Sequence, residues 1–243
     1  MTIHILERST ISALQHILKK HDIALPDGFL NDALMTMIQS LMEIEVSQSI
    51  DASRYERNGT RRAYRNGYRE SGWHIHGENL VLRIPKLRSG TYYPSFLDSN
   101  HATQAILSTI LQSYLHHVSY QTLSDLLDTI GLEAHPSQIA TLEETLYDLI
   151  ENHRQRDLSP SSIQLDIIPV DDNGRKRYLA YAFDEDELLH HDIISEADDE
   201  FWRDFVRRLD GRIIHGVEYV IVSRVHTVVR YARTTSPNMA LVA

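Results

Sequence analysis

The sequence contains no cysteine among its 243 residues, which excludes disulfide bonds, thiol catalysis and cysteine-based zinc fingers. No stretch reaches the roughly 18–20 apolar residues of a membrane span, and the N-terminus lacks the basic-then-apolar pattern of a signal peptide. A Gly-rich phosphate loop, a calcium loop and a Gly-x-Ser-x-Gly elbow are also missing. With a hydrophobic fraction of 42%, these absences predict a globular, cytoplasmic protein without a membrane partner.

Charge is distributed unevenly along the chain. The formal net charge is −10, and residues 157–210 hold 15 Asp and Glu against six Lys and Arg. Residues 53–90, here called the basic stretch, hold nine Lys and Arg against three acids, with Tyr55, Tyr64 and Tyr68 interleaved. Guanidinium groups and aromatic rings in this arrangement suit a phosphate backbone. The alternative is a solvated loop that neutralises the acidic remainder.

The N-terminal two thirds of the chain are mainly helical in their periodicity. Five segments with apolar residues at helical spacing are each predicted to form a helix: 8–24, 29–47, 102–117, 119–130 and 137–152. The first two predict a helical hairpin, and Trp73 to Arg88 alternate with a period of two, which predicts a β-hairpin. The last two resemble a helix-turn-helix, but acids on the second favour an ordinary packing unit over base readout.

From residue 157 the periodicity becomes that of strands. Three short strands joined by tight acidic turns are predicted, as in an antiparallel meander: 162–170, 176–183 and 187–194. A helix over 197–209 and an apolar strand over 217–225 follow. This order is the opening half of a ribonuclease-H-like α/β fold. Residues 227–243 show no periodicity and are expected to be disordered.

Asp166 lies in the middle of the first of these strands. A carboxylate in a buried strand is costly unless it is paired or metal-bound, and in a ribonuclease-H-like fold it would hold Mg²⁺ for phosphoryl transfer. The alternative is an edge-strand acid in solvent. His74 and His76, two apart on one strand, are interpreted as exposed histidines rather than half a metal site.

Several blocks occur together in one order along the chain. They are Tyr55-Glu56-Arg57, Arg65-Asn66-Gly67-Tyr68-Arg69, the segment LRIPKLRSG over 82–90, Leu165-Asp166, and Val220 to Ser223. In combination they resemble the bacterial Mutator-type transposases over residues 25–226. The resemblance implies a DDE transposase, whose N-terminal region binds terminal inverted repeats. A ribonuclease-H-like domain would then cut and join DNA strands with three carboxylates and Mg²⁺. Asp166 matches the first catalytic aspartate, a metal ligand.

Departures from the family pattern bear on activity. The second aspartate of the family follows the serine at the end of its strand, where this sequence has Arg224. Family members continue through a helical insertion and the catalytic glutamate, whereas this sequence ends at Ala243. We therefore expect a C-terminally truncated and catalytically incomplete copy, for which enzymatic activity is an open question.

The predicted fold class is α+β, with an N-terminal helical DNA-binding region and a β-hairpin, followed by an incomplete ribonuclease-H-like α/β domain. The expected segments are a helical hairpin at 1–52, a basic arm and hairpin at 53–98, a helical region at 99–156, the partial domain at 157–226 and a tail at 227–243. Ten residues are expected to contact DNA: Arg57, Arg61, Arg62, Arg65, Asn66, Tyr68, Arg69, Arg83, Lys86 and Arg88.

Two functions besides catalysis remain open for such a chain. One is a DNA-binding or hetero-oligomerising module that represses a full-length transposase, with terminal inverted repeats and a second or full-length copy as partners. The other is a remnant without a function.

Overall fold

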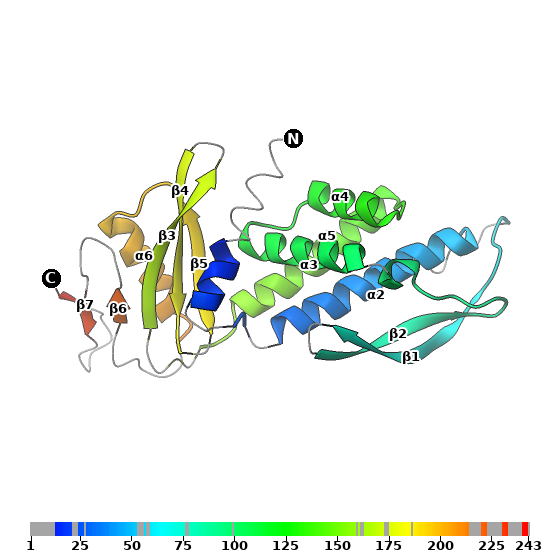
Figure 1. The fold of residues 1–243 in the computed structure, drawn as a ribbon, viewed down its shortest axis with the longest axis horizontal. Helices are drawn as coiled ribbons and strands as arrows, with labels where there is room; N and C mark the ends of the chain where they lie inside the picture. The colour runs from blue at the N-terminus through cyan, green and yellow to red at the C-terminus, as the bar shows by residue number, and fades with distance from the viewer. Residues whose placement is uncertain are drawn as a thin grey trace. The chain divides into compact units, whose positions relative to one another are not determined.

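The structure is a computed structural model (Figure 1). It describes residues 13–20, 24–26, 28–52, 56, 59–75, 78–98, 100–158, 160, 163–172, 175–185, 187–213, 220–222, 230–232 and 240–242. These fall into two compact units: a helical unit of residues 28–150 and a sheet unit of residues 1–27 and 151–243. The fold class is α+β, as predicted.

The helical unit is organised around a long helix, α2 (Phe29–Ile50). One stripe of this helix, which includes Met37 and Leu41, is fully buried, in agreement with its helical periodicity. The helix ends at Asp51, whose φ of 55° lies in the left-handed region. Short polar side chains such as aspartate tolerate this conformation better than most residues.

A hairpin of two antiparallel strands, β1 (Arg65–Ile75) and β2 (Glu78–Leu87), packs against α2 through β2 (Figure 1). Leu80, Leu82 and Ile84 are buried and alternate with exposed side chains. This alternation gives β2 one apolar face and one solvent face.

The hairpin begins earlier than predicted. It was expected from Trp73, whereas β1 begins at Arg65. The register between the strands shifts between Arg65 and Tyr68, and Gly67 has a φ of 77°. A β-bulge of this kind interrupts the period of two, so the first part of the strand has no alternation to recognise.

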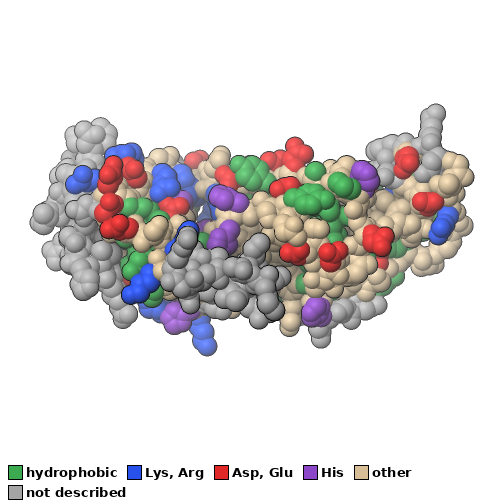
Figure 2. Space-filling model, turned by 90° about the horizontal axis from the view of Figure 1, so that it is seen from above, with side chains coloured by type: hydrophobic (Ala, Val, Ile, Leu, Met, Phe, Trp, Pro, Cys, Tyr) green, Lys and Arg blue, Asp and Glu red, His purple; other side chains and the backbone are tan. Residues whose placement is uncertain are grey.

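Three further helices complete the helical unit, after a short 3-10 helix at Ser95–Asp98. They are α3 (Asn100–Leu115), α4 (Tyr120–Ile130) and α5 (Pro136–Arg154), which confirms the three predicted helices to within two residues at each end. This part of the helical unit is poor in positive charge, since residues 89–153 contain no Lys or Arg. Acidic side chains are visible over it in Figure 2. This charge favours the packing interpretation of α4 and α5 over base readout.

The sheet unit contains the predicted meander. Its elements are β3 (Ile163–Asp172), β4 (Arg175–Phe183), β5 (Leu188–Ile194), α6 (Asp199–Asp210), β6 (Val220–Val222), β7 (Arg230–Ala232) and β8 (Ala240–Val242). The strand order is β5-β4-β3-β6-β7-β8, and β6 is parallel to β3 whereas the other pairs are antiparallel. The crossover through α6 is what permits this parallel pair.

Helix α6 covers the meander with an aromatic face. It begins at Asp198, whose side chain accepts a hydrogen bond of 2.8 Å from the backbone N–H of Phe201. Trp202, Phe205 and Leu209 are buried in one core together with apolar residues of the three meander strands. This core holds β3 in a fixed position between β4 of the meander and its parallel neighbour β6.

One of two C-terminal expectations differs from the structure. The strand predicted over 217–225 agrees where it is described, because Val220–Val222 forms β6 and the other residues lie outside the described ranges. Residues 227–243 were expected to be disordered, but they include β7 and β8. Strands of three residues are too short to show the alternation of apolar and polar residues by which a strand is recognised in a sequence.

The N-terminal segment belongs to the sheet unit. Residues 13–20, within the helix predicted over 8–24, are helical, and Leu14 and Ile17 are buried. Ala24 instead forms a parallel bridge with Glu187, and its carbonyl accepts a 2.9 Å hydrogen bond from Leu188 N. The segment expected to form a helical hairpin, 1–52, is therefore divided between the two units. No described helix combines the length and hydropathy of a membrane span.

Candidate nucleic-acid interface and buried carboxylate

Two residues of the basic stretch fasten the hairpin to α2. The Arg65 guanidinium donates to Ser47 Oγ at 2.8 Å and to the Ala52 carbonyl at 3.3 Å, and its Nε lies 3.5 Å from Glu43 Oε2. The Tyr68 hydroxyl donates to Glu43 Oε1 at 2.7 Å. The Arg65 side chain is only 16% exposed, so this arginine supports the hairpin from behind.

A second set of polar contacts holds the chain after the hairpin. Arg69 donates to the Tyr92 carbonyl at 3.2 Å, and the Tyr92 hydroxyl donates to Glu45 Oε2 at 2.6 Å. Ser95 donates to the same carboxylate through its backbone N–H at 3.1 Å and through its hydroxyl. Burial, and then the hydrogen bond to Glu45, raise the pKa of Tyr92 far above its usual value. The phenol therefore stays a hydrogen-bond donor at any ordinary pH.

The solvent face of the hairpin carries guanidinium groups stacked on aromatic rings. The Arg83 guanidinium lies 4.8 Å from the centroid of the Tyr68 ring. Tyr64 is 60% exposed, with the guanidinium groups of Arg61 and Arg88 at 5.3 Å and 5.9 Å from its ring centroid. Stacking limits the rotamers of an arginine while its donors stay available. These side chains are therefore preorganised for anionic oxygens.

The structure sorts the ten predicted DNA-contact residues into groups. Arg65 and Tyr68 contact α2, and Arg69 contacts the Tyr92 carbonyl. Five are exposed: Arg62, Asn66, Arg83, Lys86 and Arg88. Arg61 is half-buried, and Arg57 lies outside the described residues. No contact with DNA is tested by this placement, so the ten residues stay predictions.

Sequence reasoning identified this surface only in part. Tyr64 was noted as a ring interleaved with arginines, but it was not included among the ten predicted contact residues. The sequence did not indicate the roles of Glu43 and Glu45, because the periodicity of a helix does not show which strand will pack against it.

Asp166 is the buried carboxylate of the sheet unit, with 1% of its side chain exposed. Its Oδ2 accepts hydrogen bonds from Lys20 Nζ at 3.1 Å and from the Tyr181 hydroxyl at 3.0 Å. Its Oδ1 accepts one from the backbone N–H of Ile167 at 2.8 Å. The alternative of an edge-strand acid in solvent is wrong, because β3 lies between β4 and β6.

The described residues around Asp166 do not fit a magnesium site. Mg²⁺ takes carboxylate oxygens and waters at about 2.0–2.1 Å and is usually bound by one or two carboxylates. Here an ammonium group and a phenol donate to the same oxygen of Asp166. Within the described ranges, no three His, Cys, Asp or Glu side chains are grouped as metal ligands. Arg224, the position of the family's second aspartate, lies outside those ranges.

Of the two side chains that donate hydrogen bonds to Asp166, one could have been predicted from the sequence and the other could not. Tyr181 lies directly opposite Asp166 in the β3–β4 register, so pairing the two predicted strands could have found it. Lys20 is 146 residues away in the chain and had no signal.

A half-buried histidine, His190, lies against α6. The His190 ring centroid is 4.9 Å from that of Phe205. Burial, and then the charges of Arg208, Arg212 and Arg154, lower the pKa of His190 to about 4. Its Nε2 is 3.8 Å from Asp192 Oδ2, but a neutral imidazole forms no ion pair at that distance.

Asp192 has a partner of its own. The Arg208 guanidinium donates to Asp192 Oδ2 at 2.6 Å. Burial raises the pKa of Asp192, and the attraction of Arg208 opposes this effect.

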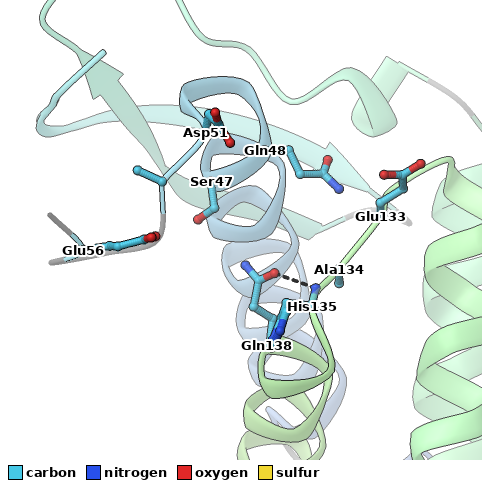
Figure 3. A pocket seen from close by; sticks show the side chains of 9 residues that line it. Ser47, Gln48, Asp51, Glu56, Glu133, Ala134, His135 and Gln138 are labelled. Carbon is cyan, nitrogen blue, oxygen red and sulfur yellow. Dashed lines mark hydrogen bonds between the residues drawn. The ribbon is translucent and has the colours of Figure 1, made fainter. Parts of the chain in front are cut away.

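A pocket of about 400 Å³ opens between the end of α2 and the start of α5. Figure 3 shows Glu56 and Glu133 on opposite sides of the end of α2, with His135 and Gln138 below. His135 is held by its neighbours, because its backbone N–H donates to Gln138 Oε1 at 2.9 Å and its Nδ1 lies 2.8 Å from Ser137 Oγ. The pocket acids are exposed and therefore screened by water, so we assign no chemistry to this pocket.

The described elements define an α+β protein with a basic hairpin and a mixed sheet around a buried carboxylate. The exposed hairpin face has the charge and aromatic content typical of nucleic-acid-binding surfaces. A family profile described as "Transposase, Mutator family" matches residues 6–241. The chain belongs to the Mutator family of transposases.

Individual relatives agree with this family. The chain is 25% identical over 214 residues to the transposase for insertion sequence element IS256 in transposon Tn4001 of Staphylococcus aureus, covering 82% of this chain and 55% of the relative. It is 29% identical over 212 residues to the transposase for insertion sequence element IS1081 of Mycobacterium tuberculosis, covering 81% and 51%. It thus spans about half the length of these relatives. The predicted Mutator-type resemblance is confirmed.

Proposed function

We propose that this chain binds the terminal inverted repeats of an insertion sequence through the solvent face of its hairpin, as the DNA-binding part of a transposase. The observation that carries this proposal is the set of arginines stacked on Tyr64 and Tyr68. DNA phosphates are recognised by guanidinium and ammonium groups, and stacked arginines lose little conformational freedom when they bind. The family membership supports the same partner.

The anchoring contacts behind the hairpin explain how this face stays in position. Arg65 and Tyr68 are tied to Ser47 and Glu43 of α2, while the opposite strand buries Leu82 and Ile84. A surface supported on both strands presents its charges without a large ordering cost on binding.

The test is a gel-shift titration with a terminal inverted repeat and a shuffled duplex, at several salt concentrations. The triple variant Arg83→Ala/Lys86→Ala/Arg88→Ala is expected to bind more weakly, and the slope of log K against log salt should fall by about 0.9 for each phosphate that is no longer neutralised. The matched control is Lys19→Ala/Arg203→Ala/Arg207→Ala, which removes three exposed positive charges of the sheet unit. Equal affinity and slope for the triple variant and the wild type would refute the proposal.

We further propose a ribonuclease-H-like origin for the sheet unit. Three observations support it: the antiparallel β3–β4–β5 meander, the crossover through α6, and the parallel pairing of β6 beside β3. Val222 at the end of β6 lies opposite Leu165, the residue before Asp166. A carboxylate shortly after β6 would therefore come close to Asp166, and this sequence has Arg224 there.

The second candidate function is a module that occupies transposon ends, or joins a full-length transposase or a second copy, without cleaving DNA. It is favoured by the engagement of Asp166 with Lys20 and Tyr181. In the gel-shift samples, addition of Mg²⁺ is then expected to give no strand cleavage. Cleavage that disappears in Asp166→Asn would instead assign catalysis, with Mg²⁺ as cofactor, to this chain.

A further inference from the structure

We propose that Lys20 is the built-in counter-ion of Asp166 and that it blocks this carboxylate from divalent metal as long as the N-terminal helix stays on the sheet. The inference goes beyond the proposed function and rests on it in one respect, which is that Asp166 is taken as the carboxylate that the family uses for metal. The contact therefore opposes metal binding at Asp166.

The first step is the geometry of the contact. Lys20 is the last described residue of the helical segment 13–20, and its Nζ lies 3.1 Å from Asp166 Oδ2. The Lys20 side chain is 30% exposed, whereas that of Asp166 is 1% exposed. The lysine thus connects a buried negative charge with the solvent side of the unit.

The second step is the energetic need for the contact. A buried ionised carboxylate without a partner of opposite charge is strongly disfavoured, and a hydrogen-bonded ammonium group removes most of that cost. Tyr181 adds a neutral donor to the same oxygen. A hydroxyl group satisfies a lone pair but supplies no charge, so among these two partners Lys20 alone neutralises Asp166.

The third step is competition with metal. A divalent cation bound to Asp166 Oδ2 would lie within a few ångströms of the Lys20 ammonium, in a site where burial weakens screening. Two cations on one carboxylate oxygen repel each other, and Oδ2 already accepts two hydrogen bonds. Metal binding at this oxygen therefore requires Lys20 to leave.

The fourth step is that the backbone around Lys20 is held on the sheet, so its ammonium group stays within reach of Asp166. Leu14 and Ile17, earlier in the same helical segment, are 1% and 0% exposed. Beyond the helix, Ala24 is tied to the sheet through the hydrogen bond from Leu188 N. Because the chain is anchored on both sides of Lys20, the ammonium group competes with any metal ion for Asp166 as long as the segment stays on the sheet.

The first test measures Mn²⁺ binding by electron paramagnetic resonance of the free ion, without DNA. Lys20→Met, which keeps the stem length and removes the charge, is expected to bind Mn²⁺ about tenfold or more tightly than the wild type. The matched control Lys19→Met removes an equal charge from the neighbouring exposed position and should bind as the wild type does. In Lys20→Met/Asp166→Asn, which restores a neutral pair, the gained binding should disappear.

Two results would overturn the proposal. One is equal Mn²⁺ binding by the wild type and Lys20→Met. The other is the absence of Mn²⁺ binding in both proteins, since removal of the Lys20 charge would then not have made Asp166 a metal ligand.

The second measurement needs no variant of Lys20 and remains valid if Lys20→Met does not fold. Amine-selective labelling followed by mass spectrometry compares Lys20 with Lys19 in the wild type and in Asp166→Asn. Lys20 is expected to react more slowly in the wild type than in Asp166→Asn, while Lys19 reacts equally in both. An unchanged Lys20 rate would show that the ion pair does not form. Neither experiment contains DNA, so both can be interpreted even if the gel shift shows that the chain does not bind DNA.

Discussion

The half-buried His190 makes the stability of the sheet unit depend on pH, and the sign follows from its pKa. The folded-state pKa is lowered from 6.5 to about 4, so between these values the unfolded chain binds a proton that the folded chain excludes. Stability therefore falls as the pH falls through this window. The contribution of His190 to the free energy of unfolding is nearly complete above pH 6.5 and decreases progressively below it.

The size of the effect follows from the same shift. One pKa unit corresponds to 1.36 kcal/mol, so the full contribution is on the order of 3 kcal/mol, of which about 2 kcal/mol is lost between pH 7 and pH 5. The His190 side chain is 21% exposed, so solvent screening makes this an upper value. Asp192, with its raised pKa, acts in the opposite sense, because an acid that prefers the neutral form in the fold gains relative stability on acidification.

Urea unfolding at several pH values measures the effect, with Trp202 fluorescence as the probe in a Trp73→Phe background. Trp202 packs against Phe205, the ring that His190 contacts, so its signal reports on this core. The free energy of unfolding of the wild type should fall by about 2 kcal/mol more than that of His190→Gln between pH 7 and pH 5. Since both proteins contain Asp192, its effect largely cancels in the difference.

Two controls define what would contradict this reasoning. His117→Gln removes an exposed histidine of the helical unit and reports the effect of losing an imidazole elsewhere. Asp192→Asn, made in both backgrounds, measures the coupling between neighbouring groups. Parallel pH profiles for the wild type and His190→Gln would show that the pKa of His190 is the same in the folded and the unfolded protein, which would refute this reasoning.

Two further predictions concern the helical unit. Tyr92→Phe removes the donor to Glu45 and should lower the free energy of unfolding by about 1.5–3 kcal/mol, measured by urea unfolding; the exposed neighbour variant Tyr93→Phe should lose far less, and equal losses would contradict the assigned hydrogen bond. Ser119→Ala removes the N-cap of α4, whose hydroxyl accepts from Thr122 N at 3.2 Å, and should cost about 1 kcal/mol in the same assay, with thermal unfolding followed by circular dichroism as a check. No loss would show that the cap contributes nothing.

Local patterns predicted most elements, because helices and the meander strands follow the side-chain period of their buried faces. The start of β1 at Arg65 was missed, since the bulge around Gly67 removes that period. The two partners of Asp166 illustrate the limit. Tyr181 follows from pairing two predicted strands, whereas Lys20 reaches Asp166 through tertiary packing of distant segments, which no local pattern encodes.

The candidate site was predicted as a set of residue types without their directions. All ten DNA-contact residues were treated alike, because alternation around a bulge does not tell which side chains face α2. The fold separates Arg65, which supports the hairpin, from Arg83 and Arg88, which lie on its open face. Side-chain direction in a strand depends on register, and register here depends on one irregular turn of the backbone.

The bridge between Ala24 and Glu187 has a consequence for how this protein meets other chains. β5 is the outermost strand on its side of the sheet, and outer strands expose unpaired backbone groups that promote aggregation through strand addition. At the start of β5, the N–H of Leu188 is already taken by the Ala24 carbonyl. The segment that brings Lys20 to Asp166 thus also occupies the start of this edge, where it opposes the addition of another strand.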